Sequence, residues 1–207
     1  MGLLSLLFQN PAAFILLAIP LLYSIIIHEL AHGWVADKMG DSTARWLGRL
    51  SLDPRKHLDP IGTLMLFIFG FGWAKPVPVN FGNLRDERKG LILVSAAGIM
   101  ANFLMAFISL LTFQILNPAP FGVFSIFLSE MAKVNVMLAA FNLIPIPPLD
   151  GSKILMGFLP PQSQYALARL EPYGFFIIIG LLWLRVLDPV IYFFNWLIIN
   201  MLSILLP

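Results

Sequence analysis

The sequence predicts an all-α polytopic membrane protein with about five transmembrane helices and one short re-entrant or β-hairpin-like segment. The composition is 59% hydrophobic and only 12% charged, which is about half the charged fraction of an average soluble domain. Residues 1–27, 90–129 and 189–207 carry no charge, and about 20 apolar residues are enough for a helix to cross a bilayer. We therefore expect one membrane-embedded domain over 1–207, with no separate soluble domain.

The first predicted helix runs from Pro11 to Met39. Asn10 is a typical N-cap residue, and proline is well tolerated in the first helical turn. Gly40 is the predicted end, because glycine adopts the left-handed conformation that terminates many helices. Pro20 lies inside this helix and predicts a kink.

Further apolar stretches predict the remaining spans. Residues 91–116 form a second span, and 131–146 form a third that ends in a proline-rich segment. We interpret 172–206 as two shorter spans with a turn at 187–189; one tilted span plus a surface helix is the alternative. Residues 61–73 are apolar but too short and glycine-rich to cross, so a re-entrant segment is expected there.

The positive residues predict the orientation in the membrane. Most of the 13 Lys and Arg residues lie between 38 and 89, and cytoplasmic loops are enriched in these residues. The 40–90 connection and the C-terminus are therefore predicted inside, and the N-terminus outside. Because these charges flank apolar spans and the net charge is only +2, no nucleic-acid partner is expected.

The sequence HELAH contains two of the three histidines, His28 and His32. A spacing of four places both imidazoles on one face of a helix, where they can bind one metal ion. Glu29 between them is the expected general base of a zinc hydrolase. The alternative is two polar residues that face lipid headgroups at a helix end. Ionisable residues next to a long uncharged run favour a site, because their burial is costly without a function.

A third ligand should come from elsewhere in the chain. Asp150 follows Pro145, Pro147 and Pro148, which should end the third span and place a non-helical backbone inside the membrane protein. Two histidines and one aspartate would leave a fourth position for water, as in catalytic zinc sites. Alternatively, this segment is only a turn where the chain leaves the bilayer. His57 is the second candidate, although its charged, proline-flanked loop is predicted to lie on the surface.

HELAH, followed by FNLIPIPPLDG, resembles the motifs of the site-2 protease family of intramembrane zinc metalloproteases. SAAGIMANF, with Gly98 and Asn102, and GFGWAKPVPVN are similar to further segments of that family. The resemblance covers 11–157 and leaves 161–207 unmatched. The chain resembles a minimal member of the family, one without a PDZ or CBS domain. For Asn102 we expect close helix packing, against the loop of the active site.

The resemblance implies one zinc per chain, held by His28, His32 and Asp150, with Glu29 as the catalytic base. It also implies that Asn142 polarises the substrate carbonyl or stabilises the oxyanion. The implied function is hydrolysis of peptide bonds within or next to transmembrane segments of substrate proteins. A membrane zinc transporter and an inactive membrane adaptor are the alternatives. The expected location is a bacterial or archaeal plasma membrane, with the active site toward the cytoplasm.

GFGWAKPVPVN alternates apolar and polar residues around two prolines, which is typical of a short edge strand. Such an edge binds an unwound peptide by strand addition, a role similar to that suggested for this region in the family. A proline-rich connector explains the pattern equally well. The expected substrate-binding residues are Trp73, Ala74, Val77, Val79 and Asn80.

Overall fold

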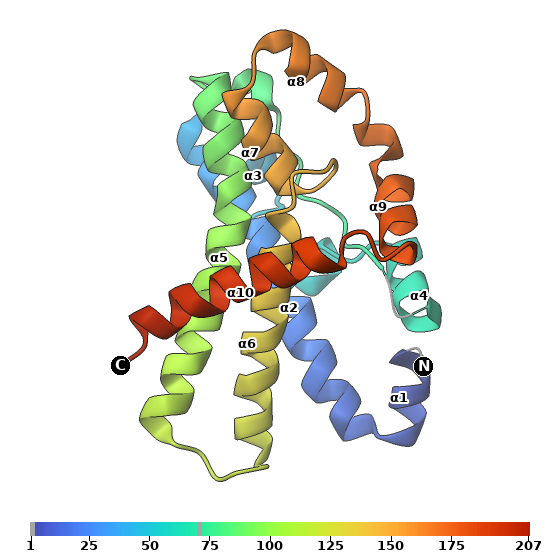
Figure 1. Ribbon diagram of the computed structural model, residues 1–207, viewed down its shortest axis with the longest axis vertical. Helices are drawn as coiled ribbons and strands as arrows, with labels where there is room; N and C mark the ends of the chain where they lie inside the picture. The colour runs from blue at the N-terminus through green and yellow to red at the C-terminus, as the bar shows by residue number, and fades with distance from the viewer. Residues whose placement is uncertain (1–2, 70–71) are drawn as a thin grey trace.

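A computed structural model describes residues 3–69 and 72–207, and the described part is built almost entirely of helices (Figure 1). The α-helices are α1 (Leu3–Gln9), α2 (Pro11–Met39), α3 (Thr43–Trp46), α4 (Pro60–Phe69), α5 (Glu87–Leu116), α6 (Val123–Asn142), α7 (Asp150–Phe158), α8 (Pro161–Ala168), α9 (Gly174–Trp183) and α10 (Asp188–Leu205). Three short 3-10 helices are η1 (Pro54–Lys56), η2 (Phe81–Asn83) and η3 (Glu171–Tyr173). The predicted all-α fold is confirmed. Of the expected hairpin-like segment, one isolated antiparallel bridge, between Leu58 and Ala74, lies within the described residues.

Helix α2 has the predicted ends. The Asn10 side chain accepts a hydrogen bond from the Ala13 amide at 3.0 Å. At the other end Gly40 has a φ of +117°, a conformation that disfavours every residue with a side chain. The helix has 29 residues, a length of about 43 Å, which exceeds the thickness of a hydrocarbon core.

The core of the protein is a bundle of α2, α5 and α6, which pack against one another (Figure 1). Helix α5 contains the predicted span 91–116 and ends at Asn117, whose φ of +39° is left-handed. Helix α6 differs from the expected span 131–146, since it covers Val123–Asn142. It stops before Pro145 because proline removes a donor and disfavours helix in the preceding residue. It starts earlier and includes Glu130 and Lys133, which form an ion pair of 2.8 Å along the helix.

In the described chain, five helical segments are long and apolar enough to cross a membrane: α2, α5, α6, Pro161–Trp183 and α10. The fourth consists of α8, η3 and α9, and α9 alone has only ten residues. The expected pair of C-terminal helices is present. Their turn lies just before the predicted position, with Arg185 at a φ of +60° and α10 starting at Asp188. Helix α10 runs across α6 rather than along it (Figure 1).

The expected re-entrant segment 61–73 contains α4, a helix of ten residues. At about 15 Å it is too short to cross a bilayer. Its Phe67 ring lies 5.9 Å from that of Phe14 on α2. Positions 70–71 lie outside the described residues, and re-entry into the membrane stays a prediction.

Candidate metal centre

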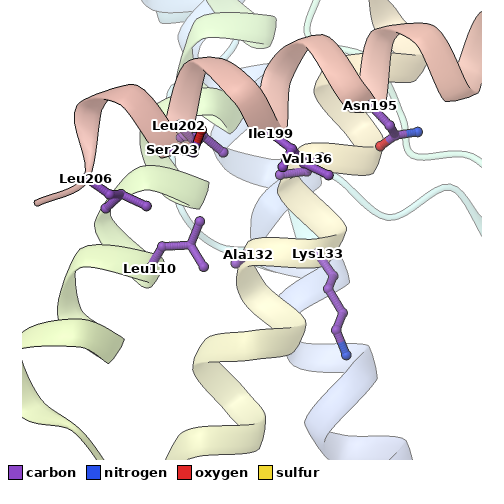
Figure 2. A pocket seen from close by; sticks show the side chains of 9 residues that line it. All are labelled: Leu110, Ala132, Lys133, Val136, Asn195, Ile199, Leu202, Ser203 and Leu206. Atoms are coloured by element: carbon purple, nitrogen blue, oxygen red, sulfur yellow. The ribbon is translucent and has the colours of Figure 1, made fainter.

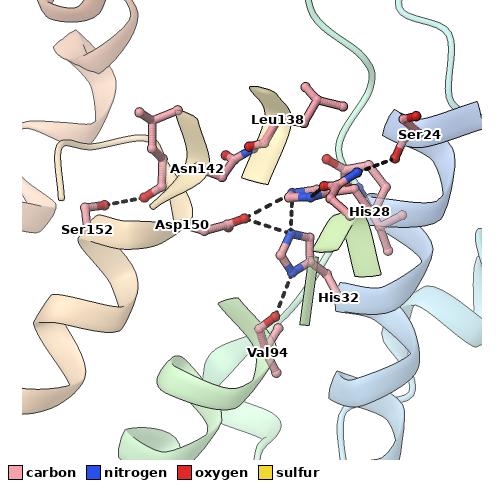
Figure 3. Close-up of polar contacts among 12 residues, drawn as sticks. Ser24, His28, His32, Val94, Leu138, Asn142, Asp150 and Ser152 are labelled. Carbon is pink, nitrogen blue, oxygen red and sulfur yellow. Dashed lines mark hydrogen bonds and ion pairs between the residues drawn. The ribbon is translucent and has the colours of Figure 1, made fainter. Parts of the chain in front are cut away.

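The structure brings together the side chains of His28, His32 and Asp150 (Figure 3). The histidines lie one turn apart on α2, and Asp150 is the first residue of α7. Asp150 Oδ2 is 3.0 Å from His28 Nε2 and 3.2 Å from His32 Nε2. The two Nε2 atoms are 3.0 Å apart. Three side chains of metal-binding type therefore meet at one buried point.

The chemistry of this group fits a metal ion. His32 Nδ1 lies 2.7 Å from the Val94 carbonyl oxygen, and His28 Nδ1 lies 2.5 Å from Asn102 Oδ1. With a proton on each Nδ1, each Nε2 atom has a free lone pair. These two lone pairs face each other and the Asp150 carboxylate. Three acceptors in contact repel unless a cation or a proton lies between them. Zinc binds this combination of imidazole and carboxylate ligands.

Gly98 of α5 leaves the space that such an ion needs. A Cβ atom at this position would lie 2.5 Å from His32 Nε2 and 2.6 Å from His28 Nε2. Any side chain here would push against the two atoms that face Asp150. The glycine in SAAGIMANF therefore serves the site as well as the packing of α5 against α2.

The Glu29 carboxylate is held by the segment after α4. Its Oε2 atom accepts a hydrogen bond from the Val77 amide at 2.7 Å. The same segment is tied to the end of α2 by Asp41, which accepts from the Asn80 amide at 2.7 Å and from Asn83 Nδ2 at 3.0 Å. Burial opposes ionisation of Asp41, but hydrogen bonds from Thr43, Asn83 and Asn80 outweigh it and lower the pKa of this carboxyl.

A cavity of about 560 Å³ joins these groups. Its walls include the three residues of the metal group, Glu29, Asn142, and loop and helix residues: Pro76, Val77, Val79, Phe81, Leu91, Val94, Ser95, Pro148, Lys153, Met156, Ala168 and Glu171. Glu29 thus lines the same cavity as both histidines and Asp150, which is the arrangement that a general base needs.

The residues expected to bind substrate separate into two groups. Val77 and Val79 line the cavity. Trp73, Ala74 and Asn80 are not among the residues that line it. The Trp73 ring packs edge-to-face on Phe175 at 5.2 Å, Ala74 takes part in the β-bridge, and Asn80 donates its amide to Asp41. Their contact with substrate stays a prediction.

Asn142 lines the same cavity, and its Nδ2 donates to the Leu138 carbonyl at 3.0 Å, one turn back on α6 (Figure 3). This bond uses one of the two N–H groups of the Asn142 amide. A role with the substrate carbonyl stays a prediction.

The loop around His57 is exposed as expected, at Arg55, Lys56 and Leu58 for example, but His57 itself is buried at 1% exposed. Its Nε2 lies 2.7 Å from the Ser51 carbonyl, and its own carbonyl accepts from the Lys75 amide at 2.8 Å. These contacts fold the charged loop over the histidine. His57 is not part of the metal group.

Asn102 has a different neighbour from the expected loop, since it contacts the His28 ring. Two further buried polar residues, Ser24 and Asn135, were not expected from the sequence and join Asn102 behind the site. The spacing of Ser24, His28 and His32 on one helix face is a signal that could have identified the first. Asn135 offered only its polarity in an apolar helix.

A second cavity, of about 510 Å³, lies between α5, α6 and α10 (Figure 2). Its lining is mostly apolar, and Lys133 is the charged residue among those that line it. Within the part of the chain that the structure describes, His28, His32 and Asp150 form the one group of three possible metal ligands. The second cavity is therefore no candidate for the metal.

Comparisons with known proteins identify the family of the chain. The model of "Peptidase family M50" matches residues 116–184. Two similar proteins are named "Putative zinc metalloprotease". YwhC of Bacillus subtilis is 40% identical over 80% of this chain and 78% of that protein. Rip2 of Mycolicibacterium smegmatis is 33% identical over 82% of this chain and 67% of that protein.

"Zinc metalloprotease MJ0392" of Methanocaldococcus jannaschii is 27% identical over 76% of this chain and 38% of that protein. No solved structure gives a significant match. With the identity to YwhC extending over most of both proteins, the chain belongs to peptidase family M50, the site-2 protease family.

Proposed function

We propose that this protein is an intramembrane zinc metalloprotease that cleaves peptide bonds within or next to transmembrane segments of other proteins. The observation that carries the proposal is the convergence of His28, His32 and Asp150 in one cavity with Glu29. In this proposal His28, His32 and Asp150 hold one zinc ion. When bound there, zinc polarises a carbonyl group and lowers the pKa of water.

Glu29 performs the proton transfers of the proposed hydrolysis. Its carboxylate takes a proton from the attacking water and gives it to the leaving nitrogen as the peptide bond breaks. The hydrogen bond from the Val77 amide to Oε2 orients the carboxylate and leaves Oε1 to receive the proton. Hydrolysis of one peptide bond consumes one water and needs no other reactant.

A substrate helix has to unwind locally, because its carbonyl groups are hydrogen-bonded within the helix. The segment from Lys75 to Asn80 is a candidate partner for the unwound chain. Pro76 and Pro78 have no amide N–H, and the amides of Lys75, Val77 and Asn80 donate within the protein. Strand addition here would therefore use the Val79 amide and the carbonyl groups.

The proposed setting is a plasma membrane, with residues 1–207 as one embedded domain and the active site toward the cytoplasm. The clustering of Lys and Arg between 38 and 89 supports this orientation. The metal group lies in the cytoplasmic half of α2 under that assignment, because His28 and His32 are nearer to Met39 than to Pro11.

Zinc transport is the less favoured function. A transported ion needs a second set of ligands toward the outer face. Under the predicted topology Glu130 and Asp188 lie near that face, and both are already paired, with Lys133 at 2.8 Å and with Arg185 at 2.9 Å. An inactive adaptor would have no need for Glu29 beside the metal group.

The test is Glu29→Gln in protein reconstituted into lipid, assayed for substrate cleavage, zinc content and zinc flux. Glutamine is nearly isosteric and still accepts the Val77 hydrogen bond through its oxygen, but it cannot take a proton from water. We expect cleavage to fall about 10²–10⁴-fold while bound zinc stays at one per chain. Cleavage at the wild-type rate would refute the mechanism, and zinc flux that survives the change would favour transport.

A further inference from the structure

Three buried polar side chains meet on the far side of the His28 ring, each from a different helix of the bundle. Ser24 lies on α2, Asn102 on α5 and Asn135 on α6, and all three are 0% exposed. A buried polar group in an apolar bundle is unfavourable unless it is fully hydrogen-bonded. This cluster meets that requirement, and the donor and acceptor of each of its amide hydrogen bonds can be assigned in only one way.

Two main-chain carbonyls fix this assignment, because a carbonyl oxygen can only accept a hydrogen bond. Asn102 Nδ2 donates to the Ser24 carbonyl at 3.2 Å, and Asn135 Nδ2 donates to the Met131 carbonyl at 2.8 Å. The second N–H of Asn102 donates to Asn135 Oδ1 at 2.7 Å, and that of Asn135 to Ser24 Oγ at 2.7 Å. Turning either amide over would place oxygen against oxygen.

The Asn102 oxygen therefore has to face His28. Asn102 Oδ1 lies 2.5 Å from His28 Nδ1, and an amide oxygen can only accept, so this nitrogen carries the proton. The lone pair of the ring is then on Nε2, toward His32 and Asp150. His32 has its proton on Nδ1 for the same reason, because this nitrogen faces the Val94 carbonyl oxygen, which can only accept.

We propose that Asn102 is a positioning residue that holds His28 in its metal-binding tautomer, and that Asn135 and Ser24 keep the Asn102 amide in the required orientation. The inference deepens the proposed function and rests on its metal site. It also explains why a conformationally adaptable amide is placed at this depth. Without the other two residues, Asn102 could rotate and present its NH₂ group to the ring.

His57 supplies an internal comparison with the opposite arrangement. Its Nε2 faces the Ser51 carbonyl, and its Nδ1 is buried with no hydrogen-bond partner in the described structure. The proton of His57 is therefore expected on Nε2. Since the chain has only three histidines, two rings should carry a proton on Nδ1 and one should not.

The first test is nitrogen-15 NMR of the full chain with labelled histidine, after removal of metal with a chelator. The pH is set about two units above the ordinary histidine pKa of about 6.5. We expect protonated Nδ1 in two rings, and an unprotonated Nδ1 in the ring that disappears in His57→Gln. An unprotonated Nδ1 at His28 in the wild-type protein would overturn the inference without any variant having to fold.

The second test is zinc affinity by competition with a chelator. Asn102→Leu keeps the approximate volume but removes the acceptor, and loss of such a partner weakens metal binding about 10–100-fold. Asn135→Leu should weaken it in the same direction by a smaller factor. The matched control is Ser109→Ala, another buried polar residue of α5, whose Oγ donates to the Met105 carbonyl of its own helix at 2.7 Å. The zinc affinity of this variant should not change.

Equal zinc affinity in folded Asn102→Leu and Ser109→Ala would refute the role of Asn102. That result would leave the proposed protease function standing, because neither test measures cleavage. Conversely, a lost Nδ1 proton at His28 in Asn102→Leu, together with weaker zinc binding, would support the inference even if no substrate were cleaved.

Discussion

Gly98→Ala adds one methyl group at the point where the two histidine rings meet Asp150. The new carbon would lie 2.5 Å from His32 Nε2 and 2.6 Å from His28 Nε2, about 1 Å closer than an ordinary contact of about 3.5 Å. Both rings are held on their other side, by the Val94 carbonyl and by Asn102. They cannot retreat without loss of at least one of these hydrogen bonds.

The magnitude follows from these contacts. Overpacking in a filled interior costs about 1–3 kcal/mol of unfolding free energy, and a lost hydrogen bond adds about 0.5–1.5 kcal/mol. Displacement of the ligands should affect zinc more strongly than stability. We expect zinc affinity to fall about 100-fold or more, at the upper limit of what loss of an outer-shell partner does.

The assay is zinc content of the purified variant, with chelator competition for the affinity and thermal unfolding for stability. Gly180→Ala is the matched control, since it is also a helical glycine but has nothing within 4 Å of an added Cβ. The control should bind one zinc and be slightly more stable, because alanine favours helix over glycine by about 0.5–1 kcal/mol. One tightly bound zinc in Gly98→Ala would refute the proposed position of the ion.

Three further predictions concern the third ligand, the loop beside the site and the orientation. Asp150→Ala should lower bound zinc well below one per chain while His57→Gln keeps it; the reverse result in metal analysis would exchange their roles. The lowered pKa of Asp41 means that its contribution to stability is present above its ordinary value of 3.8 and is lost as pH falls through the folded-state pKa. The difference in thermal stability between wild type and Asp41→Asn should therefore be constant near neutral pH and should shrink below pH 3.8. A difference that does not depend on pH would contradict this. Ser42→Cys should react with a membrane-impermeant thiol reagent only from the cytoplasmic side, as the chain has no other cysteine, and labelling from outside would reverse the topology.

The sequence alone determined those features that depend on neighbouring residues. Asn10 and Gly40 end α2 where predicted, because helix capping involves only the adjacent turn. The left-handed Asn117 ends α5 for the same reason. The spacing of His28 and His32 placed both rings on one helix face without any knowledge of the fold.

The tertiary structure decided what meets that face. Asp150 stood out among several polar residues after a proline-rich segment, but only the packing of α7 against α5 brings it beside α2. His57 was expected on the surface because its loop is charged, yet the β-bridge at Leu58 and the bond to Ser51 bury it. Local composition could not show how that loop folds over itself.

The partners of His28 and the space at Gly98 also come from tertiary structure. Asn102 and Asn135 are single polar residues in two apolar helices, and their pattern does not tell which helix they face. Their role depends on the rotation of α5 and α6 about their axes, which is set by the packing of the whole bundle. A hydrogen bond between distant segments has no local signature, so the sequence could suggest the candidate metal ligands but not the residues that contact them.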